Sequence, residues 1–168
     1  RDLNPHDADV PTLLLFVQAQ RALEEGSFDA GYLAPTVNVA QRSHADAAYI
    51  AVAQAVLKAA ETDTQGAREA LATALRTRGN DAFILYLAGR LEQRLGDATA
   101  TEHLAAAVQR DPALIAASIA LAETKSDDGQ REEALALIDA ALRRTSNHLR
   151  AKLWRGFLSA DDVDPQTG

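Results

Sequence analysis

Apolar and small residues recur along this chain at spacings of three and four, which is the pattern of helices with one buried face and not of strands. In the second half the pattern occurs twice. The first copy contains Leu85, Gly89, Gly96, Ala100, Leu104, Ala107 and Pro112. The second copy contains Ser118, Ala122, Gly129, Ala134, Ile138, Ala141 and Ser146. Gly96 and Gly129 lie 33 residues apart, and a period of this length predicts stacked helical hairpins, which mostly hold other proteins.

Glycine, proline and capping residues divide this pattern into helices. The predicted ranges are 11–25, a second arm within 27–42, 45–61, 67–78, 82–95, 98–110, 113–124, 130–144 and 148–160. They predict one helical-repeat domain over residues 11–160, preceded by an extended lead-in (1–10) and followed by a flexible tail (161–168). Within the domain we expect an irregular hairpin (11–44), three hairpins (45–80, 81–111, 112–146) and a capping helix (147–160).

Several local features carry their own predictions. Pro35 should interrupt the second helix, because proline lacks a backbone N–H and clashes inside a helix. Residues 62–66, which end in a glycine, should form a turn. Asp81 and Asn147 should cap the helices that follow them. The acidic pair at 127–128 should favour the start of the next helix through the helix dipole.

Composition narrows the class of protein. The chain has 168 residues, 36 of them alanine, and aromatic residues make up only 5%. Alanine is the strongest helix former, so the fold class is all-α. The net charge of −7 argues against a general binder of nucleic-acid backbones and against tight docking on anionic lipid. The absence of cysteine excludes disulfides, thiolate chemistry and cysteine-ligated zinc.

The repeated unit resembles the tetratricopeptide repeat. That family places a small residue in the first helix, a glycine at the turn, small and large residues in alternation on the second helix, and a proline near the end. Two copies match as quoted above, and Ala55, Gly66, Ala67, Leu71 and Ala74 match more weakly. The match covers residues 46–147. It implies a right-handed α-solenoid whose first helices line a concave groove, with the last helix as a cap; a less regular solenoid of helical hairpins is the alternative.

The resemblance also implies a partner-binding groove. The residues that it assigns to the groove are Tyr49, Phe83, Tyr86, Arg90, Arg94, Ile119, Glu123, Arg150 and Trp154. Four of them, together with Gln93, share one helix face over residues 83–94, and aromatic and arginine side chains are common anchors in protein contacts. The two arginines could hold a carboxylate of a peptide. The alternative is that the aromatic residues belong to the core and the arginines are solvated.

The capping helix carries a second candidate surface. Leu153, Trp154, Phe157 and Leu158 form an apolar face. This face either seals the end of the domain or contacts a partner, which would include a second copy in a homodimer.

Motifs for catalysis or metal binding are missing from the sequence. It contains no phosphate loop, nucleophile elbow or dinucleotide fingerprint. The histidines, His6, His44, His103 and His148, are far apart, so we expect no metal site. We also expect no cofactor, no enzyme activity and no insertion into a membrane, because the longest apolar runs have seven residues.

These observations favour a non-catalytic adaptor that binds a peptide or protein. The excess of arginine over lysine and the high alanine content suggest a GC-rich bacterium, in which such modules serve motility, secretion, envelope assembly or signalling. One alternative is a structural subunit of a larger assembly. Another is a regulatory or targeting domain of a larger enzyme such as a kinase, since the chain starts at Arg1 and we expect it to be an excised segment. The sequence does not indicate the compartment.

Overall fold

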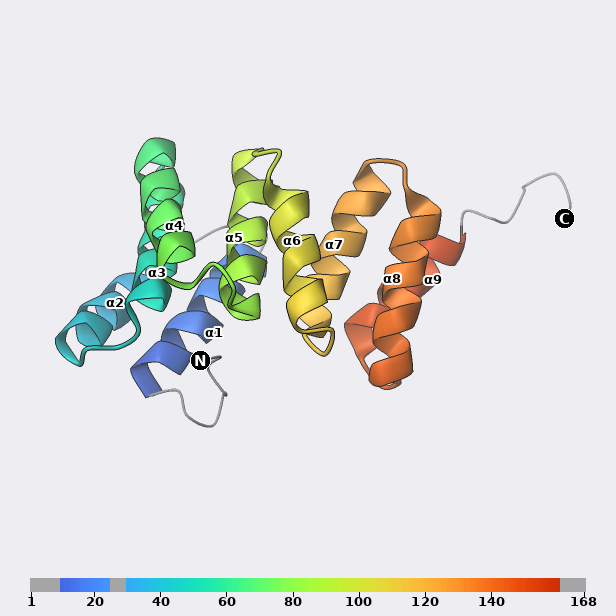
Figure 1. The fold of residues 1–168 in the computed structure, drawn as a ribbon, viewed down its shortest axis with the longest axis horizontal. Coiled ribbons are helices and arrows are strands. Elements are labelled where there is room, and N and C mark those ends of the chain that lie inside the picture. Colours follow the sequence, from blue (N-terminus) through green and yellow to red (C-terminus); the bar gives the residue numbers. More distant parts are fainter. Residues whose placement is uncertain (1–9, 25–29, 161–168) are drawn as a thin grey trace, which may run out of the picture.

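The computed structural model describes residues 10–24 and 30–160, and in these parts α-helices joined by turns are the regular secondary structure, without strands (Figure 1). The predicted all-α class is therefore confirmed for the described residues. The helices are α1 (Val10–Glu24), α2 (Leu33–Arg42), α3 (Ala47–Ala60), α4 (Thr64–Arg78), α5 (Ala82–Leu95), α6 (Ala100–Arg110), α7 (Ile115–Asp127), α8 (Arg131–Arg144) and α9 (Leu149–Ala160). The sequence predicts an extended lead-in over residues 1–10, but Val10 already belongs to α1. Residues 1–9 of the lead-in, the helix end at 25–26 and the tail at 161–168 lie outside the described residues.

Aspartates begin three of the helices. The Asp46 carboxylate accepts a hydrogen bond from the Ala48 N–H at 2.9 Å, and the Asp63 carboxylate accepts one from the Gly66 N–H at 2.8 Å. Asp81 accepts from two backbone N–H groups at the start of α5, so its predicted capping role is confirmed. Each cap satisfies backbone donors that the first turn of a helix leaves without a partner.

The turn between α3 and α4 differs from the prediction for residues 62–66. Gly66 lies inside α4 and is buried, and Thr62 instead adopts the left-handed conformation with a φ of 67°. Gly96 and Gly129 hold the same conformation in the next two hairpin turns, with φ of 72° and 76°. The helix starts early because Asp63 caps it, so a threonine takes the turn position that glycine occupies elsewhere.

Three other local predictions also differ from the structure. Pro35 lies in the first turn of α2 and does not interrupt it, because a missing N–H costs nothing there. The pair Asp127 and Asp128 ends α7 and does not begin α8, which starts at Arg131. At the start of α9 the His148 ring nitrogen accepts from the Ala151 N–H at 3.3 Å, while the Asn147 side chain accepts from Lys152.

Consecutive helices pack as antiparallel pairs, α3 with α4, α5 with α6 and α7 with α8, and the pairs follow one another along the molecule (Figure 1). Small residues lie where the helices cross. Gly89 of α5 faces Leu104 of α6 so closely that an added Cβ atom would lie 2.6 Å from the leucine Cγ. Ala107 is fully buried on the same helix as Leu104. Close crossings of this kind depend on the absence of a bulky side chain.

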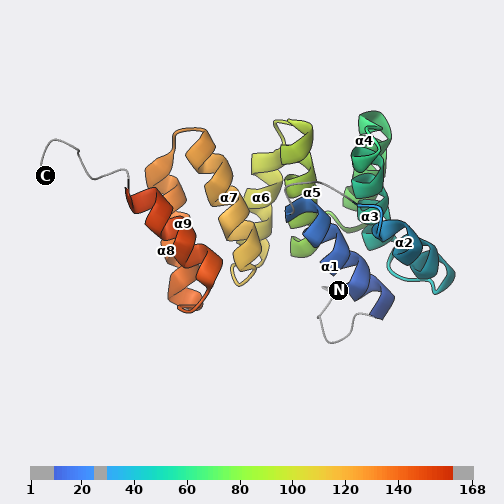
Figure 2. The same ribbon diagram turned by 180° about the vertical axis from the view of Figure 1, so that it is seen from behind.

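The first helix departs from this pairing. α1 packs against α2, but it also packs across α3 and α5, on the side of the molecule that faces the viewer in Figure 2. The last helix, α9, packs on α7 and α8 on that same side. We call this side the α1 face.

Candidate functional site: the α1 face

α1 is fixed to the hairpins at its start by a hydrogen bond and in its middle by aromatic side chains. The Asp46 N–H donates to the Thr12 hydroxyl at 3.0 Å. Four residues later, Phe16 packs edge-on against Phe83, with 4.8 Å between ring centroids, and against Tyr49 at 6.4 Å. Edge-to-face aromatic pairs add stabilisation to the burial of their apolar surface. Two residues predicted to line a groove therefore lie beneath α1.

The end of α1 is held by polar side chains of α5. Arg94 donates two hydrogen bonds, at 2.8 and 3.0 Å, to the carbonyl oxygen of Leu23 in the last turn of α1. A cation is favoured at this end because of the helix dipole. The Tyr86 hydroxyl donates to the Glu24 carboxylate at 2.7 Å. The last turn of α1 is thus anchored to α5 through both backbone and side chain.

Glu24 also belongs to a chain of ion pairs that crosses the α1 face. Arg150 of α9 lies 3.2 Å from Glu24 and 3.0 Å from Glu123 of α7. Glu123 in turn pairs with Arg90 of α5 at 2.6 Å. Arg90 and Glu123 are largely buried, whereas Arg150 is 39% exposed. Two acids and two arginines from four different helices therefore balance one another, which removes much of the cost of burying charge.

Burial and hydrogen bonding shift the pKa values of Glu24 and of the two buried tyrosines, Tyr49 and Tyr86. Burial raises the pKa of Glu24, but the hydrogen bonds from Tyr86 and Gln20 and the charges of Arg150 and Arg90 outweigh it, so the pKa lies below its ordinary value. Burial, with the nearby Glu24 charge, raises the pKa of Tyr86. Burial and the Asp81 carboxylate, which accepts from the Tyr49 hydroxyl, raise the pKa of Tyr49. Glu24 therefore stays charged and both tyrosines stay neutral near pH 7.

The structure brings most of the predicted groove residues to the α1 face, but several of them are covered. Tyr49, Tyr86 and Ile119 are buried. Phe83 is half-buried and packs against Phe16. The remaining members are Arg90, Arg94, Glu123, Arg150 and Trp154, and all of them except Trp154 take part in the contacts described above. Trp154 is half-buried, and its ring packs edge-to-face with the ring of Phe157, with 5.4 Å between the centroids.

Large apolar side chains are exposed at the two ends of the α1 face. On α1 the exposed residues are Val10, Leu13, Leu14 and Val17. On α9 they are Leu149, Leu153 and Phe157. Among the described residues only Val39 of α2 adds a further large apolar side chain that is exposed. Both sets have helical spacing, so each forms a stripe along its helix. We call them the α1 stripe and the α9 stripe.

Sequence reasoning did not place Phe16, Glu24 or the α1 stripe in the site. Their contacts join positions up to 126 residues apart, from Glu24 to Arg150, and no local pattern reports such a pairing. One signal was present, since residues 13–17 read Leu-Leu-Leu-Phe-Val. A run of this kind places apolar side chains on several sides of a helix, so one side can pack against the hairpins while another stays exposed.

The described residues contain no group of three or more metal-ligating side chains. His103 pairs with the Glu92 carboxylate at 2.7 Å across the α5–α6 hairpin, which gives it a structural partner. Over residues 10–24 and 30–160, every helix is too short or too polar to cross a bilayer.

Comparison of the sequence with protein-family models and with curated proteins gives no match in either case.

Proposed function

We propose that this chain is a non-catalytic protein–protein interaction module that binds a peptide or protein partner across the α1 face. The observation that carries the proposal is the distribution of exposed apolar residues. Seven of the eight large apolar side chains that are exposed in the described residues lie on α1 and α9. Exposed apolar surface that gathers in patches is typical of contact sites. The ion pairs between the two stripes add charged groups that a partner can meet.

We also propose that the hairpins form a tetratricopeptide-like solenoid, with the α1 face as its concave side. Two observations support this assignment. Small residues recur at equivalent crossings, and left-handed turn residues recur at positions 62, 96 and 129. In this arrangement α1 lies within the groove itself, so the partner contacts the outer side of α1 and the adjoining α9, and not the covered Tyr49 and Tyr86.

Site-specific photo-cross-linking in the producing cells tests the binding proposal. A photoreactive amino acid is placed at Val17 on α1, at Leu153 on α9 or at Val39 on α2. Val39 is a matched control, because Val17 and Val39 are both 50% exposed and only Val17 belongs to the α1 stripe. We expect the same cross-linked partner from Val17 and Leu153 and none from Val39. Equal cross-linking at all three positions, or none at Val17 and Leu153, contradicts the proposal.

A structural subunit is the second candidate, and the α9 stripe favours it. Leu149, Leu153 and Phe157 are each at least 60% exposed, which is unusual for the last helix of a stack that ends in water. Sedimentation of the isolated chain separates the two functions. A soluble monomer supports the adaptor, whereas precipitation that Leu153→Ser and Phe157→Ser together relieve supports the permanent subunit.

A further inference from the structure

Gly156 occupies a position in α9 at which two hairpins, α5–α6 and α7–α8, place a covered small residue. It is the eighth residue of α9, as Gly89 is of α5 and Ala122 is of α7. The spacings between these three residues are 33 and 34, which are those of the repeat. The three positions therefore correspond.

In the complete hairpins the next helix covers this position. Leu104 of α6 lies against Gly89, and Ile138 of α8 belongs to the same buried cluster as Ala122. At Gly156 an added Cβ atom would meet nothing within 4 Å. Glycine inside a helix lowers its stability relative to alanine, and no contact in the described residues explains this one.

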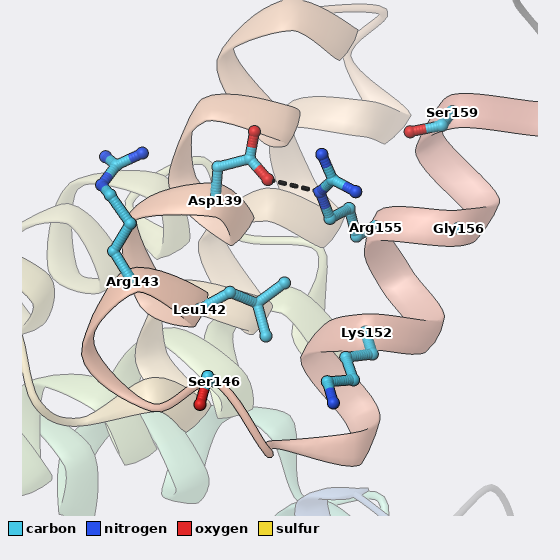
Figure 3. A pocket seen from close by; sticks show the side chains of 8 residues that line it. All are labelled: Asp139, Leu142, Arg143, Ser146, Lys152, Arg155, Gly156 and Ser159. Carbon is cyan, nitrogen blue, oxygen red and sulfur yellow. Dashed lines mark hydrogen bonds and ion pairs between the residues drawn. The ribbon is translucent and has the colours of Figure 1, made fainter.

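A hollow lies at Gly156, between α8 and α9 (Figure 3). Its volume is about 650 Å³. It is lined by Asp139, Leu142 and Arg143 of α8, by Ser146 of the connecting turn, and by Lys152, Arg155, Gly156 and Ser159 of α9. Figure 3 shows Leu142 and Arg155 reaching into the space between the two helices, with the bare backbone of Gly156 beside them. These α9 residues lie on a different face of the helix from the α9 stripe.

The hollow carries an excess of positive charge. Its lining contains three cationic residues, Arg143, Lys152 and Arg155, and one acidic residue, Asp139, although the whole chain has a net charge of −7. Arg155 pairs with Asp139 at 2.6 Å, whereas Lys152 has, within residues 10–24 and 30–160, only the Asn147 amide oxygen, at 3.3 Å. Arg143 has no acidic partner among the described residues. A helix that covers this hollow is therefore favoured if it presents carboxylates.

The complete hairpins also indicate the direction of such a helix. In each one a polar side-chain contact joins the end of the first helix to the start of the second: Lys58 with Asp63, Glu92 with His103, and Lys125 with Glu133. A helix docked on α9 in the same way runs antiparallel to it. Its C-terminal half then lies beside Lys152.

We propose that the hollow between α8 and α9 is a docking site for an amphipathic α-helix of a partner protein. The helix places a branched aliphatic side chain over Gly156 and carboxylates opposite Lys152 and Arg143. This site is separate from the α1 face, so it does not depend on the function proposed above.

Two peptide probes test the site on the full chain. One copies residues 126–146, the turn and the helix that cover the corresponding face of α7. The other carries Arg143→Glu and Arg144→Glu within the peptide, so that its C-terminal half is acidic. We expect saturable binding in fluorescence anisotropy, about tenfold tighter for the acidic peptide, together with slower amide exchange over residues 149–160.

Variants of the chain test separately whether binding depends on the open space at Gly156 and on the charge of Lys152. Gly156→Leu fills the crossing, so both peptides should bind about tenfold or more weakly, while the melting temperature of the free chain rises because leucine is the better helix former. Lys152→Glu should remove the preference for the acidic peptide. Binding that Gly156→Leu leaves unchanged, or no binding of either peptide, would overturn the proposal.

Two other occupants of the hollow have distinct outcomes. If the unmodified chain dimerises with concentration and Gly156→Leu abolishes the dimer, the occupant is a second copy and the proposal is wrong. A chain shortened to end at Ala160 should bind both peptides as the full chain does. Much tighter binding by the shortened chain would show that residues 161–168 fill the hollow, which also overturns the proposal.

Discussion

Gly89 and Gly156 stand at the same position in their helices but have opposite surroundings. Gly89 lies against Leu104, and even a methyl group would collide with it. Gly156 faces open space. The same residue thus allows a close crossing inside the α5–α6 hairpin and leaves an uncovered position on α9, the last described helix.

The contrast extends to the helices that carry these glycines. α5 is buried along most of its length, from Ile84 to Glu92. α9 buries only Ala151 and Leu158 and exposes its large apolar stripe. In a stack of hairpins each unit depends on its neighbours for burial, so a terminal helix with exposed leucine and phenylalanine retains surface that a neighbour can cover.

The largest difference should come from shortening a leucine in each region. Leu104→Ala removes a fully buried side chain from the crossing with Gly89, so we expect a loss of about 2–5 kcal/mol in the free energy of unfolding. Leu153→Ala acts on a side chain that is 65% exposed and should change stability by about 0.5 kcal/mol or less. Urea unfolding measures both. A similar loss for the two variants would mean that α9 is covered in solution.

A smaller difference, with opposite signs, should come from adding one methyl group to each glycine. The Gly89→Ala methyl would lie 2.6 Å from the Leu104 Cγ and 3.0 Å from the Ala100 carbonyl oxygen, so we expect a loss of about 1–3 kcal/mol. Gly156→Ala meets no atom and should gain about 0.5–1 kcal/mol from reduced backbone entropy. Thermal unfolding of both variants checks the signs. A loss for Gly156→Ala would contradict the open surroundings of that residue.

The smallest effect should come from Glu24, which contacts Tyr86 of α5 and Arg150 of α9 and so links the two regions. Because the pKa of Glu24 is lowered in the folded chain, its stabilisation is present above the ordinary glutamate pKa and is lost as the pH falls through the folded value. We expect Glu24→Gln to flatten the fall in stability between about pH 6 and pH 3. The difference should stay below about 1 kcal/mol, since water screens this half-buried group. Urea unfolding at a series of pH values tests it, and parallel curves for the two proteins would exclude the effect.

Local chemistry in the sequence was enough to predict the helices and some of their ends. The spacing of apolar residues gave the all-α class, and Asp81 caps α5 as expected. The errors arose where two local signals competed. Gly66 was assigned to a turn, but the Asp63 cap starts the helix before it, and Thr62 makes the turn.

Local patterns in the sequence did not indicate that another helix covers the predicted groove. The pattern placed Tyr49, Phe83 and Tyr86 on the inner side of the hairpins, and they do lie together. What covers them is α1, through Phe16 and Glu24, and that contact depends on where the whole first helix lies. The spacing of residues within a helix does not report which distant part of the chain the helix packs against.

The ion pairs that join Glu24 to Arg150 also affect how the chain comes apart. Linear arrays held only by adjacent units lose their outermost helices first, in small independent steps. Here the first and last described helices share one set of charges on the middle helices. When the helix at one end unfolds, the helix at the other end therefore loses an ion-pair partner. Unfolding should be more cooperative than in an array without these ion pairs.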